Sequence, residues 1–117
     1  MAGLNPRLPD IDVDAAVYGI TIASQLANLH PQTLRQYDRL GLVSPTRSMG
    51  RTRLYSLRDI ARLREVAQLT AEGVNLAGIQ RILQLEAENL RLKQRLAELT
   101  RQASSSAVVV WRPNRNR

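Results

Sequence analysis

Residues 30–41 constrain the fold of this chain more than any other stretch. Pro31 has a fixed backbone angle and no amide hydrogen to lose, so it suits the first turn of a helix, and Gly41 can take the left-handed conformation that ends one. Leu34 and Tyr37 lie three residues apart and give this helix a narrow apolar side. Packing alone does not account for its outward polar residues, which are Gln32, Thr33, Arg35, Gln36 and Arg39.

A second short helix is expected directly upstream, over residues 21–27, with the Thr21 hydroxyl as its cap. Asn28, in the turn between the two helices, tolerates left-handed angles, and His30 stands where the cap of the second helix belongs. Two short helices joined by so tight a turn form a helix-turn-helix, whose second helix enters the major groove of DNA. The residues of the first helix that we expect to be buried are Ile22, Ala23 and Leu26.

A basic hairpin is expected to follow the second helix. Residues 42–45 and 53–55 favour extended structure, and the polar turn between them contains Gly50. Beside a recognition helix, such a wing would lie along the phosphates or in the neighbouring minor groove. A charged surface hairpin without a role in DNA binding is the alternative. The candidate DNA contacts in the wing are Arg47, Arg51, Arg53 and Tyr55.

A third helix is expected to start at Ser56, because Ser56 and Asp59 match a capping box, and to end at Gly73. With a short extended segment at 17–20, these elements would form one compact domain over residues 17–73. Residues 1–16 are interpreted as a mobile arm, and a solvated tail without a role is the alternative. The buried face of the third helix would consist of Leu57, Ile60, Leu63 and Ala67.

The charge balance indicates a nucleic-acid partner. The chain of 117 residues carries a formal net charge of +7, from 17 lysines and arginines against 10 acidic residues. Eight arginines lie between Arg35 and Arg64, and only Asp38 and Asp59 offset them there. Because arginine suits bidentate contacts to phosphate and guanine, the expected partner is double-stranded DNA.

Composition also excludes several classes of function. The chain contains no cysteine and one histidine, which leaves no disulfide, thiolate site or histidine cluster. No glycine-rich phosphate loop, serine elbow or pair of catalytic carboxylates is present, so we expect no enzyme, metal site or cofactor. No segment reaches the roughly 18 consecutive apolar residues of a membrane span, and no signal peptide is visible. We therefore expect a cytoplasmic protein without a membrane partner.

The longest helical run is expected over residues 74–102, where good helix formers prevail and proline is absent. Apolar residues recur there at alternating steps of three and four, as in the seam of a coiled coil. This seam should pair with a second subunit, and Asn89 would help to fix the register. A helix folded back onto its own domain is the alternative. The seam consists of Ile82, Leu85, Asn89, Leu92, Leu96 and Leu99.

Residues 103–117 are interpreted as a flexible tail, with residues 103–106 as a spacer before an apolar stretch and three arginines. An exposed stretch of this kind is an aggregation hazard unless something covers it. We expect it to dock as an extended peptide in the groove of a partner. A strand added to the same protein and an incidental tail are the alternatives. The candidate partner-binding residues are Val108, Val109, Val110 and Trp111.

These motifs resemble the MerR family of dimeric transcription regulators. The resemblance covers residues 33–42, the end of the wing at 53–56 and the terminal helix. Residues 30–45 and 72–79, together with the Val-Val-Trp of the tail, are similar to the HspR branch of heat-shock repressors. The resemblance implies a mainly α fold, in which a winged helix-turn-helix DNA-binding domain precedes a long dimerisation helix that pairs antiparallel as a coiled coil.

The resemblance also assigns roles to individual residues. By position, Arg35, Tyr37 and Arg53 would hold phosphates. Gln32, Thr33 and Gln36 are our candidates for base edges, since glutamine suits adenine. Arg39 would reach phosphate or pair locally with Asp38.

The implied function is repression of heat-shock and chaperone genes by a homodimer on an inverted repeat, with the DnaK chaperone as co-repressor. The tail has the apolar core and basic flank of a peptide that DnaK clasps. The cysteines of metal- and redox-sensing relatives are missing, as is a ligand-binding domain, so no small-molecule effector is expected. A MerR-like activator is one alternative, and a coiled-coil adaptor that carries a DnaK-binding peptide is another.

Overall fold

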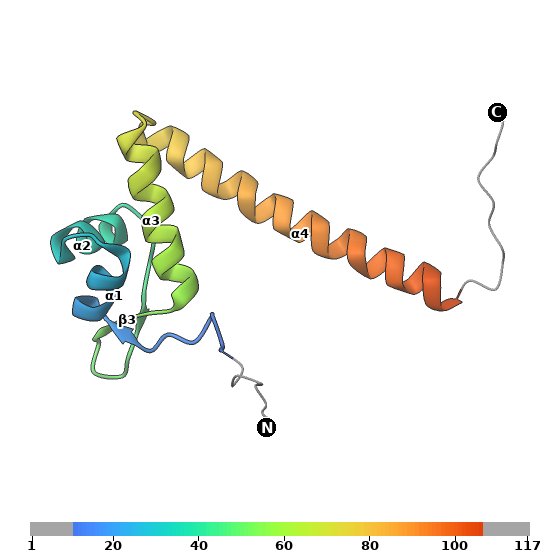
Figure 1. Ribbon diagram of the computed structural model, residues 1–117, viewed down its shortest axis with the longest axis horizontal. Coiled ribbons are helices and arrows are strands. Elements are labelled where there is room, and N and C mark those ends of the chain that lie inside the picture. The colour runs from blue at the N-terminus through green and yellow to red at the C-terminus, as the bar shows by residue number, and fades with distance from the viewer. Residues whose placement is uncertain (1–10, 107–117) are drawn as a thin grey trace, which may run out of the picture. The chain divides into compact units, whose positions relative to one another are not determined.

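The computed structural model describes residues 11–106, which divide into two units at the boundary between Ile79 and Gln80. The fold is mainly helical with a small sheet (Figure 1). The elements are β1 (Tyr18–Gly19), α1 (Ile20–Ala27), α2 (Pro31–Arg39), β2 (Thr46–Arg47), β3 (Arg53–Tyr55), α3 (Leu57–Ala71) and α4 (Leu76–Ser106).

The expected helix-turn-helix is confirmed in α1 and α2. Asn28 ends α1 in the left-handed conformation, with φ 59° and ψ 46°. His30 caps α2, because its Nδ1 accepts a hydrogen bond from the backbone N–H of Gln32 at 3.0 Å. Gly41 follows α2 with φ +75°, a conformation that favours glycine. Local capping therefore fixes both ends of the short second helix.

The buried side of α1 differs from the expectation. Ile22 and Leu26 are 47% and 48% exposed, whereas Ala23, Ser24 and Ala27 are buried. These small side chains allow α1 to pack closely on α2 and α3. The helix also begins at Ile20, before Thr21, and its N-cap residue makes no side-chain hydrogen bond. The prediction that Thr21 caps this helix is wrong, because the chain enters α1 directly from strand β1.

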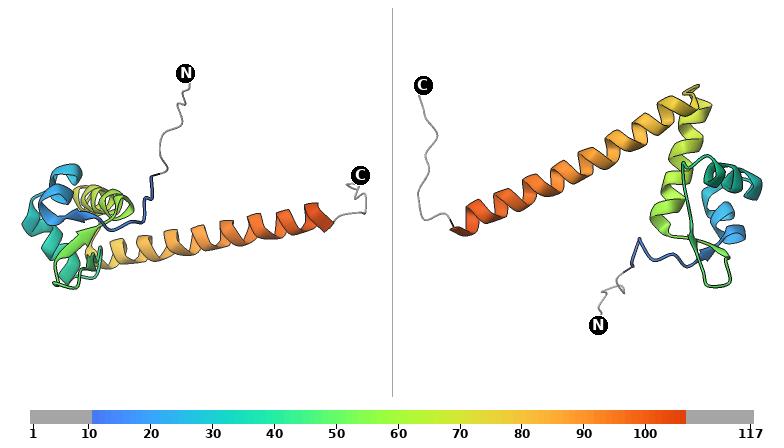
Figure 2. Two further views of the ribbon diagram at one scale, coloured as in Figure 1. Left: turned by 90° about the horizontal axis from the view of Figure 1, so that it is seen from below. Right: turned by 180° about the vertical axis from the view of Figure 1, so that it is seen from behind.

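A three-stranded antiparallel sheet of order β1-β3-β2 holds the hairpin. Tyr18 pairs with Tyr55 across β1 and β3, and Arg47 pairs with Arg53 across β2 and β3. The expected hairpin is present, but its first strand is Thr46–Arg47, which was expected to lie in the turn, whereas residues 42–45 form no strand because Leu42 and Val43 enter the core. The extended segment expected before α1 is present as β1 and belongs to the same sheet. Figure 2 shows the hairpin loop from two further sides.

The predicted capping box is confirmed at the start of α3. Ser56 and Asp59 exchange hydrogen bonds, each 3.0 Å long, between side chain and backbone N–H. The buried face of α3 consists of Ile60, Leu63 and Val66, whereas Leu57 and Ala67 are only half-buried. The core of the first unit comprises Ala23, Ala27, Leu34, Tyr37, Leu42, Val43, Tyr55, Ile60, Leu63, Val66 and Ile79.

Residues 11–16 contact the start of α3, in contrast to the mobile arm expected over 1–16. The N–H of Arg58 donates to the Val13 carbonyl at 3.0 Å, and the Arg58 guanidinium pairs with Asp14. The Asp14 carboxylate raises the pKa of Arg58 above its usual value. Residues 1–10 lie outside the described part of the chain.

Helix α4 continues to Ser106, so residues 103–106 are helical and the prediction of a flexible spacer there is wrong. Alanine favours a helix and serine disfavours one only slightly, and neither glycine nor proline interrupts the segment. Within the second unit, the ion pairs Glu88–Arg91 and Glu98–Arg101 join residues three apart on the helix surface. The partner-binding residues Val108, Val109, Val110 and Trp111 lie outside the described residues.

Candidate nucleic-acid interface

The outward face of α2 carries the side chains that we expected to meet DNA. Gln32, Gln36 and Arg39 are exposed, and Thr33 and Arg35 are partly exposed. Arg35 Nη1 donates to Gln32 Oε1 at 3.3 Å, one helical turn away. Leu34 and Tyr37 anchor the opposite side of the helix in the core. The helix therefore presents amides and guanidiniums outward on a fixed apolar base.

Two tyrosines proposed as DNA contacts are largely buried. Tyr55 is 0% exposed and lies in the core, so its assignment as a DNA contact is wrong. The side chain of a strand residue alternates between the two faces of the sheet, and that of Tyr55 points inward. Burial raises the pKa of the Tyr55 phenol, whose hydroxyl makes no hydrogen bond within the structure. Tyr37 is 9% exposed, which leaves little of its surface for a phosphate.

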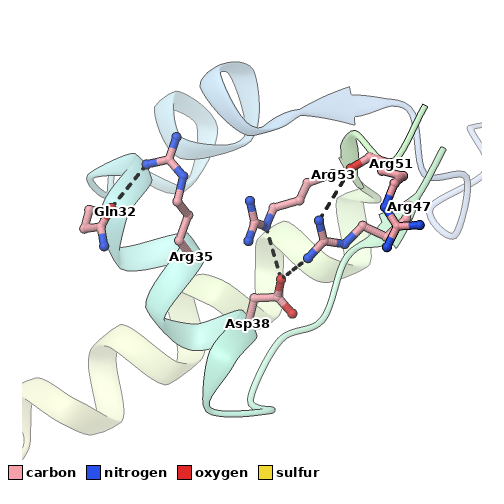
Figure 3. Close-up of polar contacts among 6 residues, drawn as sticks. All are labelled: Gln32, Arg35, Asp38, Arg47, Arg51 and Arg53. Carbon is pink, nitrogen blue, oxygen red and sulfur yellow. Dashed lines mark hydrogen bonds and ion pairs between the residues drawn. The ribbon is translucent and has the colours of Figure 1, made fainter. Parts of the chain in front are cut away.

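The Asp38 carboxylate connects α2 to the wing (Figure 3). Its Oδ2 accepts from Arg47 Nη2 at 3.0 Å and from Arg53 Nε at 3.1 Å. Asp38, which we considered as a local partner of Arg39, is thus a partner of the hairpin instead. The sequence pattern does not predict this bridge, and the one signal for it in the sequence is an acidic residue within a run of arginines.

The loop of the hairpin is closed by its own backbone and by Ser48. The N–H of Arg51 donates to the Ser48 carbonyl at 2.8 Å, and the N–H of Thr52 donates to Ser48 Oγ at 3.1 Å. Arg51 has φ +68°, and its carbonyl accepts from Arg47 Nη1 at 3.5 Å. Met49 is fully exposed at the tip. The wing is therefore an ordered basic projection beside α2.

A groove of about 360 Å³ borders the outward face of α2. Thr33 and Gln36 line one side, and Thr70 of α3 with Leu76 and Ile79 of α4 line the other. The groove lies entirely within the first unit. Two of the three candidate base readers therefore have open space beside them, which leaves their side chains free to adjust to a base edge.

Two further classes of site are absent from residues 11–106. In that range, no three histidine, cysteine, aspartate or glutamate side chains come together in a way that could hold a metal ion. The helices of the same range are each too short or too polar to cross a membrane.

The fold and this surface define a winged helix-turn-helix DNA-binding protein, in which an exposed polar helix lies beside a basic hairpin. Comparison with known proteins specifies the class further. The chain belongs to the MerR family, because residues 18–86 match the family described as "MerR HTH family regulatory protein". It is a transcriptional regulator of that family.

Among its relatives, a Streptomyces coelicolor protein described as heat shock protein HspR is 47% identical over 136 aligned positions, which cover 91% of this chain and 90% of the relative. The HTH-type transcriptional regulator GlnR of Bacillus anthracis is 33% identical over 90 positions, covering 74% of this chain and 70% of GlnR. The second of these relatives is described as a transcriptional regulator.

Two solved structures share the fold. A MerR-family transcriptional regulator from Bacillus cereus superposes with a TM-score of 0.53 at 22% identity, over 80% of this chain and 87% of that one. The regulator PbrR691 from Ralstonia metallidurans, solved with lead(II), gives a TM-score of 0.54 at 22% identity, over 85% and 93% of the two chains. At this identity the likeness concerns the fold alone.

Proposed function

We propose that this protein is a sequence-specific repressor of heat-shock and chaperone genes, which binds an inverted repeat as a homodimer in the cytoplasm. The observation that carries the proposal is the exposed polar face of α2 beside the arginines of the wing. Similarity to HspR over nearly the whole length of both chains supports the choice of target genes.

In this proposal, base reading and phosphate contact fall to different residues. Gln32, Thr33 and Gln36 would reach base edges in the major groove, because amides and hydroxyls offer donors and acceptors that distinguish base pairs. The guanidiniums of Arg35, Arg39 and the wing would contact phosphates and set the register of the helix without reading sequence. Of the two wing guanidiniums that bond to Asp38, that of Arg53 donates through Nε and so keeps both terminal nitrogens for a phosphate.

Dimerisation would use the seam of α4. Leu85, Leu92, Leu96 and Leu99 are each about half exposed or more in the single chain, and Asn89 is exposed beside them. Burying roughly half of a leucine side chain is worth on the order of 1 kcal/mol, so several leucines from two subunits provide a substantial driving force. An antiparallel pair would place the two α2 helices on successive major grooves of one duplex face.

The apolar tail would serve the chaperone DnaK as a docking peptide. Its residues lie outside the described part of the chain, so this step rests on the sequence pattern of an apolar core with a basic flank. With DnaK bound, DNA binding would be favoured. When heat-damaged proteins compete for DnaK, repression would lapse.

One selection experiment tests the proposal. The purified chain is mixed with a randomised duplex library at about 150 mM salt, where non-specific phosphate binding is curtailed, and the retained DNA is sequenced. We expect enrichment of one inverted repeat. Retention without a motif would contradict sequence-specific repression.

A second selection with DnaK tests the chaperone step, on chains with and without residues 107–117. Only the chain with the intact tail should bind DNA more tightly when DnaK is added.

A further inference from the structure

We infer that Asp38 is a positioning residue that raises the preference of the protein for its operator over random DNA by holding the arginines of the wing in place. The inference rests on the proposed function and deepens it. Asp38 would hold the arginines of the wing in one arrangement and at the same time weaken their attraction to DNA of any sequence. It would therefore raise the ratio of operator affinity to random-DNA affinity without contacting a base.

The first observation is the position of the Asp38 carboxylate between two elements. Within residues 11–106, two side-chain hydrogen bonds join α2 to the hairpin, and Asp38 Oδ2 accepts both. Arg47 Nη2 donates at 3.0 Å and Arg53 Nε at 3.1 Å. The Asp38 side chain is only 15% exposed, so water screens this pair less than it would on an open surface. The bridge therefore sets where the wing stands relative to the recognition helix.

The second observation is which nitrogens the two arginines use. Arg53 donates through Nε, which leaves both of its terminal nitrogens to form a fork toward a phosphate. Arg47 donates through Nη2 to Asp38 and through Nη1 to the Arg51 carbonyl. Figure 3 shows both guanidiniums converging on the carboxylate. Arg47 thus braces the hairpin, and Arg53 is pre-oriented for a phosphate.

The third observation is charge. Asp38 is one of only two acidic residues among the eight arginines from Arg35 to Arg64. Non-specific DNA binding follows the number of phosphate charges that the protein neutralises and makes little demand on geometry. Binding at one register does demand geometry, because each side chain that must be immobilised lowers the affinity. Loss of Asp38 should therefore raise the affinity for random DNA and lower the ratio of operator affinity to random-DNA affinity.

Three variants of the full-length chain separate the effect of the Asp38 charge from the effect of the position of its carboxylate. Asp38→Asn removes the charge and weakens both hydrogen bonds, whereas Asp38→Glu keeps the charge but moves the carboxylate by one methylene. Glu72→Gln is the charge control, because Glu72 is exposed at the end of α3 and accepts from Gln68 at 2.7 Å, a bond that glutamine can keep. Affinity is measured on the selected operator and on a random duplex across a range of salt.

For Asp38→Asn we expect affinity for random duplex to rise about threefold to tenfold, with a salt dependence steeper by about one. The operator-to-random ratio should fall about tenfold, the equivalent of losing the orientation of one or two side chains. Asp38→Glu should leave random-duplex affinity within about twofold of wild type and lower operator affinity about threefold or more. Glu72→Gln should change both affinities equally and by less than about twofold.

Other outcomes overturn the inference. If Asp38→Asn lowers both affinities alike, or matches Glu72→Gln, Asp38 is only a structural or a bulk-charge residue. If Asp38→Glu keeps the wild-type ratio, the position of the carboxylate is irrelevant, and this variant decides the matter even if Asp38→Asn fails to fold. A wild-type chain that prefers no duplex at all would instead refute the proposed function.

Discussion

At the scale of the residue, the structure separates side chains that build the domain from side chains that face DNA. Tyr55 lies in the basic wing but is buried in the core, with its hydroxyl unpaired within the structure. Gln36 and Arg39, in the neighbouring helix, are exposed. Burial rather than residue type therefore decides which aromatic and polar residues are available for contact.

The substitution Tyr55→Phe should leave the free energy of unfolding unchanged or raise it by up to about 1 kcal/mol, because it removes a buried hydroxyl without a partner. Operator affinity should stay within about twofold of wild type. Tyr55→Ala, by comparison, should cost about 3 to 5 kcal/mol through the cavity it leaves. Chemical denaturation measures both. A loss above about 1 kcal/mol for Tyr55→Phe would mean that the hydroxyl has a bonding partner.

The burial of Tyr55 also predicts how the stability of the folded chain depends on pH. Because burial raises the pKa of Tyr55 in the folded chain, the folded state retains the phenol proton to a higher pH than the unfolded state. Its contribution to stability is therefore full below the unfolded pKa near 10 and declines as the pH rises above it. Wild type should lose more stability than Tyr55→Phe between about pH 9 and 11. Parallel curves for the two proteins would contradict this.

Two substitutions test whether base reading and phosphate contact fall to different residues. Gln36→Ala should cost roughly 1 to 3 kcal/mol on the operator and little on random DNA, since it removes a base contact. Arg53→Ala should weaken binding to both duplexes and reduce the salt slope by about one, since it removes a phosphate contact. Fluorescence anisotropy with the two duplexes measures each effect. Equal losses on both DNAs for Gln36→Ala would exclude Gln36 from base reading.

At the scale of the element, local signals predicted the boundaries of the helices better than their buried faces. The caps at His30 and Ser56 and the turn at Asn28 depend on residues close in sequence, and the structure confirms all three. The outward side of Ile22 depends on how closely α1 packs against α3, which no local pattern specifies. The Asp38 bridge spans nine and fifteen positions along the chain and likewise requires the assembled fold.

Helix α4 offers a matched pair of leucines to test the seam. Leu92 and Leu90 are both 50% exposed in the single chain, but only Leu92 belongs to the predicted seam. Leu92→Lys should therefore convert the dimer to monomer at micromolar concentration, because two charges would have to be buried in the interface. Leu90→Lys should leave the dimer intact. Analytical ultracentrifugation measures both, and equal effects of the two substitutions would exclude the seam as the interface.

At the scale of the whole molecule, the proposed repressor needs two recognition helices held at a fixed separation. One α2 helix presents too few side chains to specify a long site, so specificity must come from two half-sites read together. The dimer would convert the second contact into an intramolecular one and raise the overall affinity without a new type of contact. The distance between half-sites should therefore matter as much as their sequence.

If a dimer reads an inverted repeat from one face of the DNA, its affinity must depend on the spacing between the two half-sites. We would measure affinity for the selected operator and for the same operator with about five base pairs inserted at its centre, which turns one half-site to the opposite face. We expect the insertion of five base pairs to lower the affinity at least about tenfold, with partial recovery when about ten base pairs are inserted. Equal affinity for all three duplexes would contradict it, because each recognition helix would then be binding independently.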